Sequence, residues 1–138
     1  MDENDKVMRT REQKYASDVF TRVTAFGERF PKGKQERNQY GSMAHKLPIL
    51  VRTAGLAQAL AFVAARGDMA HRQLLLDLAV TVGYNDVERF LEQSRTLAFP
   101  QYMRLSQKVI AALLWYKRFA QSVLDVDAAT DAELGRAQ

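Results

Sequence analysis

The sequence predicts an all-α single domain, a bundle of five to six helices packed around a hydrophobic central helix at about residues 48–66. Apolar residues recur at helical spacings along most of the chain, and no stretch shows the alternation of a β-strand. Almost every side chain from Pro48 to Arg66 is apolar or small, which is typical of a helix surrounded by others. A length of 138 residues fits one domain with its own core.

The first long helix is expected from about Asp5 to Phe30, because Pro31 and Gly33 follow it. Its core stripe recurs at spacings of three, four and seven residues: Met8, Tyr15, Val19, Val23, Phe26 and Phe30. A second helix is expected from Lys34 to about Lys46. It should end at Leu47-Pro48, because a residue that precedes proline avoids the α region.

The central helix should then begin at Pro48, since proline suits the first helical turn, and end before Gly67. Its predicted buried stripe comprises Ile49, Leu56, Leu60 and Val63. The run of about 19 residues approaches the length of a membrane span. Pro48, Arg52 and Gln58 within it argue against insertion.

Three further helices are expected: Met69–Val82, Asp86–Gln93 and Pro100–Leu124. Asp68 is a suitable N-cap for the first of them, and Asn85 with Glu88 resembles a capping box for the second. Residues 1–5 and the Ala/Asp-rich tail 125–138 are expected to fray.

The charge is unevenly distributed along the chain. Residues 9–66 contain eleven Lys/Arg against four Asp/Glu, and residues 95–118 contain five against none. Between these basic blocks, residues 67–93 contain two Lys/Arg against five Asp/Glu. This asymmetry favours a polyanionic partner, although a solvated basic surface is the alternative interpretation.

One aromatic residue lies among the basic residues of the last predicted helix. Trp115 shares a helical face with Arg104, Lys108 and Arg118. Such a surface can stack a nucleic-acid base while its cations bind phosphates. The alternative is that Trp115 belongs to the core and is covered by the aliphatic stems of the neighbouring cations.

The residues that catalysis or metal binding would require are missing. The two histidines, His45 and His71, form no metal-binding pair, and there is no cysteine. Glu88 and Glu92 are paired only on a face expected to be exposed, and no phosphate-binding loop or nucleophile elbow is present. The sequence therefore predicts a protein that is not an enzyme and carries no metal or cofactor. Its acidic first residues lack an apolar signal region, which predicts a soluble, cytoplasmic protein.

Two segments resemble signatures of a known family. The first reads Tyr40-Gly41-Ser42-x-Ala44-x-Lys46-Leu47-Pro48, then Ile49, Leu50 and Arg52, then Gly55-Leu56-x-Gln58-x-Leu60-Ala61-Phe62. The second reads Leu114-Trp115-Tyr116-Lys117-Arg118-Phe119. Together they resemble the small helical subunit of the type III-B (Cmr) CRISPR RNA-silencing complex, over roughly residues 10 to 120. Thr53-Ala54 departs from the pattern, because the family often has a larger polar pair there.

The resemblance implies a non-catalytic subunit for antiviral defence. Several copies would stack as an inner filament beside the backbone subunits, which carry the guide RNA and cleave the target. The expected partners are therefore other Cmr subunits, further copies of this chain, guide RNA and target RNA, and no membrane. The candidate RNA-binding residues are seven basic ones: Lys34, Arg37, Lys46, Arg52, Arg104, Lys108 and Arg118.

The Gly55-Leu56 motif and the basic faces each allow a second interpretation. The Gly55-Leu56 motif suits close packing within the bundle or against a partner equally well. The basic faces also suit a helical protein–protein adaptor that binds acidic subunits and never contacts RNA. A small helical enzyme is a third, weaker alternative, because no nucleophile–base pair is present.

Overall fold

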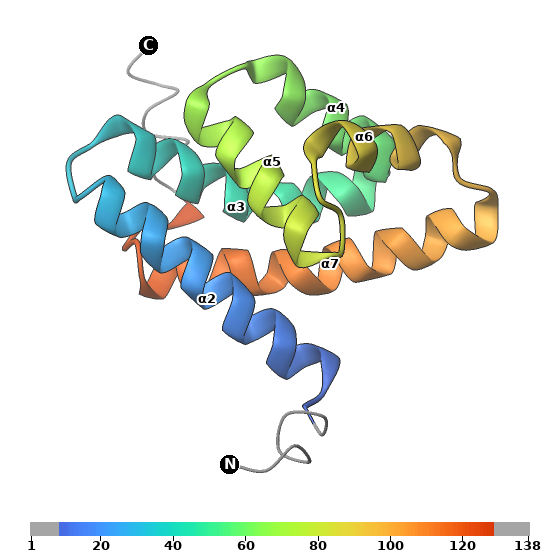
Figure 1. Ribbon diagram of the computed structural model, residues 1–138. Helices are drawn as coiled ribbons and strands as arrows, with labels where there is room; N and C mark the ends of the chain where they lie inside the picture. The colour runs from blue at the N-terminus through green and yellow to red at the C-terminus, as the bar shows by residue number, and fades with distance from the viewer. Residues whose placement is uncertain (1–8, 129–138) are drawn as a thin grey trace.

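A computed structural model describes residues 9–128, and the elements in that part are helices joined by short loops, without strands (Figure 1). The helices, labelled as in Figure 1, are α2 (Arg11–Arg29), α3 (Gln35–Ala54), α4 (Leu56–Arg66), α5 (Met69–Thr81), α6 (Val87–Thr96) and α7 (Phe99–Ser122). The predicted all-α bundle of five to six helices is confirmed.

Helices α3 and α7 form an antiparallel pair along the length of the molecule. Arg37 near the start of α3 reaches Leu124 beyond the end of α7, whereas Ala57 just after α3 reaches Tyr102 near the start of α7. Helix α2 crosses the C-terminal half of α7, α4 and α5 pack on α3, and α6 packs on α4 (Figure 1). Within residues 9–128, none of the helices combines the length and the apolar character that crossing a membrane requires.

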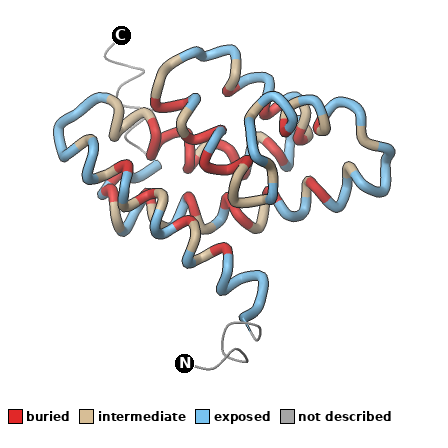
Figure 2. Tube along the Cα trace, viewed as in Figure 1, coloured by how far each residue is buried: buried red, intermediate tan, exposed pale blue. Residues whose placement is uncertain are grey.

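The core lies between these layers, and α3 is its centre. Consecutive residues from Tyr40 to His45 are all buried, because α3 packs against α4, α5 and α7 at once. Each of the six helices contributes buried residues to this core, and the red stretches in Figure 2 gather toward the middle of the molecule. A central hydrophobic helix is thus present, but its position in the chain differs from the prediction.

The predicted central helix at 48–66, and the predicted break at Leu47-Pro48, are wrong. Helix α3 continues through Pro48, which is buried in its last two turns, and ends at Ala54. A proline inside a helix removes one hydrogen bond and costs about 3 kcal/mol. Packing of α3 on three other helices outweighs this cost.

Gly55 is the residue that divides the apolar run into two helices. Its φ of 91° and ψ of 159° lie in a region that other residues rarely adopt. A Cβ atom there would also approach the Tyr102 hydroxyl at 3.3 Å. That hydroxyl accepts a hydrogen bond of 3.2 Å from the backbone N–H of Ala57, which satisfies one free donor at the start of α4. The Gly55-Leu56 motif is therefore an internal corner.

The predicted stripe of the central helix is confirmed only in part. Leu56, Leu60 and Val63 are fully buried within α4. Ile49 belongs to α3 and is 56% exposed, since the corner at Gly55 separates its direction from that of α4.

Helices α2 and α6 begin at other residues than predicted, because Thr10 and Asp86 are their N-caps. Helix α2 begins at Arg11, where Thr10 and Gln13 form a reciprocal capping box with hydrogen bonds of 2.8 and 3.1 Å. Met8 and the earlier part of the predicted helix lie outside the described residues. Asp86, and not Asn85, caps α6 by accepting a hydrogen bond of 2.7 Å from the backbone of Arg89.

Asp68 does precede α5 as expected, but its side chain caps no backbone donor. Its carboxylate instead lies 2.9 Å from Nδ1 of the buried His71.

The segment after α7 folds back against α3. Val126 is 1% exposed, and a Cβ atom at Gly41 would lie only 2.6–2.9 Å from its side chain. Fraying was expected from residue 125 onward, so Val126 departs from that expectation. Residues 129–138 and 1–5 lie outside the described residues, and their fraying stays a prediction.

Candidate nucleic-acid interface

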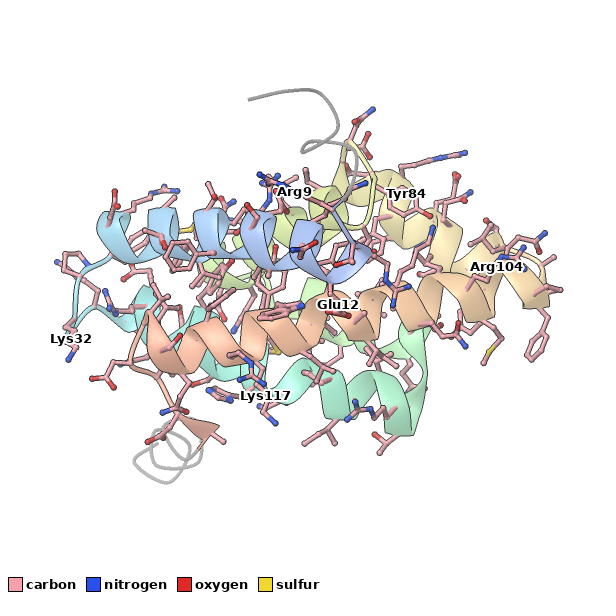
Figure 3. All side chains as sticks on the ribbon, turned by 90° about the horizontal axis from the view of Figure 1, so that it is seen from below. Arg9, Glu12, Lys32, Tyr84, Arg104 and Lys117 are labelled. Carbon is pink, nitrogen blue, oxygen red and sulfur yellow. The ribbon has the colours of Figure 1, made fainter. Side chains whose placement is uncertain are left out.

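Helix α7 carries four cations and no carboxylate. Arg104, Lys108, Lys117 and Arg118 are all exposed, while the apolar face of the helix is buried against α2 and α3. The cations do not form one row. Figure 3 shows Arg104 and Lys117 on opposite sides of α7. Two separate basic hollows result, one on each side.

The first hollow, here called the α3–α7 groove, has a volume of about 550 Å³. It is lined by His45, Leu114, Lys117, Arg118, Gln121 and Ser122. His45 is 8% exposed and its Nε2 donates a hydrogen bond of 2.7 Å to the carbonyl of Val126. This bond fixes the imidazole as part of the structure, so His45 supports the groove while Lys117 and Arg118 supply its charge.

The second hollow, here called the α6–α7 pocket, has a volume of about 350 Å³. Its lining residues are Val82, Gly83, Tyr84, Gln93, Leu97, Gln101, Arg104, Leu105 and Lys108. It brings together two of the predicted candidates, Arg104 and Lys108, with an aromatic ring. In Figure 3, Tyr84 and Arg104 lie on the same side of α7.

Arg37 has a structural role that differs from its predicted one. Its guanidinium donates to four backbone carbonyls at 2.9–3.2 Å: that of Gly27 in the last turn of α2, that of Phe30 just after α2, and those of Val123 and Leu124 after α7. These carbonyls lie at helix ends and lack helical partners. The five donors of an arginine are thus largely used inside the molecule, so Arg37 holds three helix ends together.

The remaining candidates on α3 are spread along and around that helix. Lys34 is exposed at its N-cap, Arg52 is exposed in its last turn, and Lys46 is half-buried between them. Lys46 and Arg52 are six residues apart, which places them about 120° apart around the helix. The seven predicted residues therefore do not form a single face.

Trp115 matches neither of its predicted environments fully. It is half-buried, and its indole Nε1 donates a hydrogen bond of 2.7 Å to Glu12, which Figure 3 shows between α2 and α7. Its ring stacks on Phe119 at 5.6 Å between centroids, and the Arg118 guanidinium lies 5.8 Å from its centroid. The ring thus joins α2 to α7 and leaves little of its face for a base.

A partly buried polar network explains the position of Tyr116 in the second signature. Thr81 on α5 lies 2.6 Å from Asp18 of α2 and 2.8 Å from the Tyr116 hydroxyl of α7. Burial raises the pKa of Tyr116 far above its ordinary value, so the phenol stays neutral. Arg22 pairs with Asp18 at 2.9 Å. The network connects α2, α5 and α7, so we assign Tyr116 a role in stabilising the bundle.

Several lining residues had not been selected from the sequence. Lys117 was within the second signature, and the absence of acidic residues over 95–118 would have identified it. The sequence did not mark Tyr84, Gln93 and Gln101 as candidates, because only the fold brings the α5–α6 loop and α6 beside α7. Across residues 9–128, no three His, Asp or Glu side chains gather closely enough to hold a metal ion.

Comparison with known proteins identifies the family. Residues 11–123 match the model of the family described as CRISPR-associated protein (Cas_Cmr5). The chain is 46% identical over 118 residues to the CRISPR system Cmr subunit Cmr5 of Thermus thermophilus, a match that covers 86% of this chain and 99% of that protein. It is also similar to the crystal structure of a CRISPR-associated Cmr5 family protein from the same organism, with a TM-score of 0.76 over 84% of this chain and 98% of the other. The chain belongs to the Cas_Cmr5 family of CRISPR-associated proteins.

Proposed function

We propose that this protein is a non-catalytic small subunit of a cytoplasmic type III-B (Cmr) CRISPR ribonucleoprotein complex. In that complex it binds guide or target RNA through its basic surfaces. Membership of the Cas_Cmr5 family supports the assignment to the complex. RNA cleavage would belong to other subunits, which agrees with the sequence prediction that this chain lacks catalytic groups.

The observation that carries the RNA-binding role is the composition of α7. Four exposed cations without a carboxylate give this helix a strongly positive surface. Each phosphate that such a cation neutralises releases counterions and adds salt-dependent affinity. Contacts of this kind position an RNA without reading its sequence, which would come from pairing between guide and target.

Exposed apolar side chains support contacts with other subunits or with further copies of this chain. Leu114 in the α3–α7 groove is 43% exposed, and Ile49 on α3 is 56% exposed. Phe99 at the start of α7 is 73% exposed. We propose that these side chains become buried when copies stack as an inner filament. They are also what favours the second candidate function, a helical adaptor that binds protein subunits only.

The test measures RNA affinity as a function of salt concentration. It compares the isolated protein, the assembled complex, and the complex that lacks this protein. The variant Lys117→Glu/Arg118→Glu reverses the charge of the α3–α7 groove. Arg72→Glu is the matched control, because Arg72 is exposed on α5 outside both hollows. We expect the groove variant to lower target affinity at least about tenfold at low salt and to reduce the salt slope by about 1.4, the value for two phosphate contacts on a single strand.

Unchanged affinity and an unchanged salt slope in a folded groove variant would favour the adaptor. In that case the chain should remain associated with the other subunits after ribonuclease treatment. Loss of association after the same treatment would instead support an RNA contact.

A further inference from the structure

We infer that the α6–α7 pocket binds one unpaired RNA nucleotide, with its phosphate at Arg104 and Lys108 and its base against Tyr84. This inference rests on the proposed RNA-binding function and extends it from a charged surface to a defined site. The pocket volume of about 350 Å³ lies at the lower end of the range for small-molecule sites, which suits a ligand of this size. None of the lining residues found in the described part carries a carboxylate, so nothing in the pocket opposes an anion.

The phosphate end is formed by α7. Arg104 and Lys108 are four residues apart, so their side chains leave the same face of the helix with about 5–6 Å between their Cβ atoms. Both are exposed, and neither has an ion-pair partner among residues 9–128. Arg89, by comparison, is paired with Glu92 at 2.9 Å. Arg104 and Lys108 thus keep their charge available to a ligand.

The base end is formed by the loop between α5 and α6. The Tyr84 ring packs against the buried Phe90, with 5.3 Å between centroids, so its orientation is fixed before a ligand arrives. Partial burial raises the pKa of its hydroxyl, which keeps the phenol neutral beside an anionic ligand. Any base can stack on such a ring, because every base has a π-face.

The direction of the nucleotide follows from the helix dipoles. The C-terminal end of α5, at Thr81 and Val82, carries partial negative charge and disfavours a phosphate. The phosphate therefore belongs on the α7 side of the pocket and the base on the side of the loop. This arrangement places the negatively charged phosphate beside the two cations and the neutral base beside the C-terminal end of α5.

Two amides in the lining suit a base without a fixed sequence. The side chains of Gln93 and Gln101 form no hydrogen bonds with other residues in the described part of the chain. An amide offers both a donor and an acceptor and can rotate to present either one, so it accepts different base edges. A base inside a duplex has its faces covered by its neighbours, whereas an unpaired one can enter the pocket.

The test uses the full chain and the assembled complex with a single-stranded oligouridylate that carries 5-iodouridine. We expect ultraviolet crosslinking to modify Tyr84. Tyr84→Leu should weaken binding of the single strand about tenfold with an unchanged salt slope, since it removes stacking and no charge. Tyr84→Phe, which keeps the ring, should stay within about twofold of the wild type.

Arg104→Gln/Lys108→Gln should reduce the salt slope by about 1.4 on the same RNA. A duplex RNA should respond to these two substitutions and not to Tyr84→Leu. A crosslink outside the pocket, or equal binding by folded Tyr84→Leu and Tyr84→Phe, overturns the inference. If Tyr84→Leu does not fold, the crosslink in the wild type decides.

The variant Lys117→Gln in the α3–α7 groove distinguishes failure of the pocket inference from failure of the proposed RNA-binding function. If it weakens binding while the pocket variants do not, the proposed function stands and the pocket inference fails. If no variant on either side of α7 changes RNA binding, the proposed RNA-binding function fails as well.

Discussion

The hydroxyl of Tyr40 donates a hydrogen bond of 2.6 Å to Oδ2 of Asp77 across the interface between α3 and α5. Both side chains are buried. The other carboxylate oxygen accepts a hydrogen bond of 2.9 Å from Gln73, and an Arg22 guanidinium nitrogen lies 3.9 Å from it. A charge-assisted bond in a buried site is strong because water cannot replace it. The first residue of the family signature thus connects the central helix to its neighbour.

Tyr40→Phe should destabilise the bundle by about 1.5–3 kcal/mol, because the Asp77 carboxylate loses a hydrogen bond while it stays buried. The measurement is the free energy of unfolding from urea denaturation at neutral pH. Tyr15→Phe is the matched control: Tyr15 is buried in α2, and its hydroxyl forms no hydrogen bond with other residues of the described part. It should change stability by less than about 0.5 kcal/mol. If the two substitutions lower the free energy of unfolding equally, the Tyr40–Asp77 hydrogen bond contributes no more to stability than a buried tyrosine hydroxyl without a partner.

Stability should also depend on pH through Asp77. Burial raises the pKa of this carboxyl above its ordinary value of 3.8, although hydrogen bonds from Tyr40 and Gln73 and the charge of Arg22 act in the opposite direction. The folded protein therefore holds this proton more tightly than the unfolded chain does. The stabilising contribution of protonated Asp77 is fully present below the ordinary pKa and is lost as pH rises through the raised one.

The variant Asp77→Asn has no such proton to lose. We expect the wild type to gain stability relative to Asp77→Asn as the pH falls from neutral toward the ordinary carboxyl pKa. Urea denaturation of both proteins across this range measures the difference. Parallel stability curves for the two proteins would mean that the pKa of Asp77 is not raised in the folded state.

The helices and their core faces were predictable because apolar periodicity is a local property. Tyr40 lies within the helix predicted from Lys34 to about Lys46. Its bond to Asp77 could not be predicted, since the two residues are 37 positions apart and only the packing of α3 on α5 brings them together. The error at Pro48 has the same origin: local preference predicts a break there, and contacts with three other helices override it.

The candidate site was predictable in its charge and not in its geometry. The basic block over 95–118 gave the sign of the surface, and four of its cations lie exposed on α7. The spacing of 13 residues places Arg104 and Lys117 about 140° apart around a helix, and Figure 3 shows them on opposite sides of α7. Sequence could not reveal which neighbouring segments complete the hollow beside each cation, because the packing of the helices decides this. Nor could it reveal that Arg37 is directed inward to backbone carbonyls that come from distant parts of the chain.

Arg37→Lys should destabilise the protein by about 2–4 kcal/mol, although it keeps the charge. A lysine ammonium cannot reproduce the planar fork that donates to four carbonyls at the ends of α2 and α7. Lys34→Gln, which changes an exposed cation one turn earlier, should leave stability within about 0.5 kcal/mol of the wild type. Urea denaturation measures both. An Arg37→Lys variant as stable as the wild type would contradict the structural role of Arg37. A reduced salt slope for RNA binding by Arg37→Gln would instead support the original prediction that Arg37 contacts RNA.

Gly41 lies within α3, at a position where a helix would normally favour alanine. Alanine is preferred over glycine inside a helix by about 0.5–1 kcal/mol. Here a Cβ atom would lie 2.6–2.9 Å from the side chain of Val126, so the segment after α7 would have to move. Gly41→Ala should therefore destabilise the protein by about 1–3 kcal/mol, as overpacked core substitutions do. The backbone N–H of Val126, bonded to the carbonyl of Ala120 at 3.0 Å, should lose protection from hydrogen exchange.

A double-mutant cycle with Val126→Gly isolates this contact. Val126→Gly alone should destabilise the protein, because it removes a buried side chain. In that background Gly41→Ala no longer meets an obstacle, and the helix preference for alanine should make it neutral or stabilising. The cycle is measured by urea denaturation, with hydrogen exchange at residue 126 as the local readout. If Gly41→Ala costs the same with and without the Val126 side chain, the glycine of the signature is required for some reason other than close approach of the C-terminal segment.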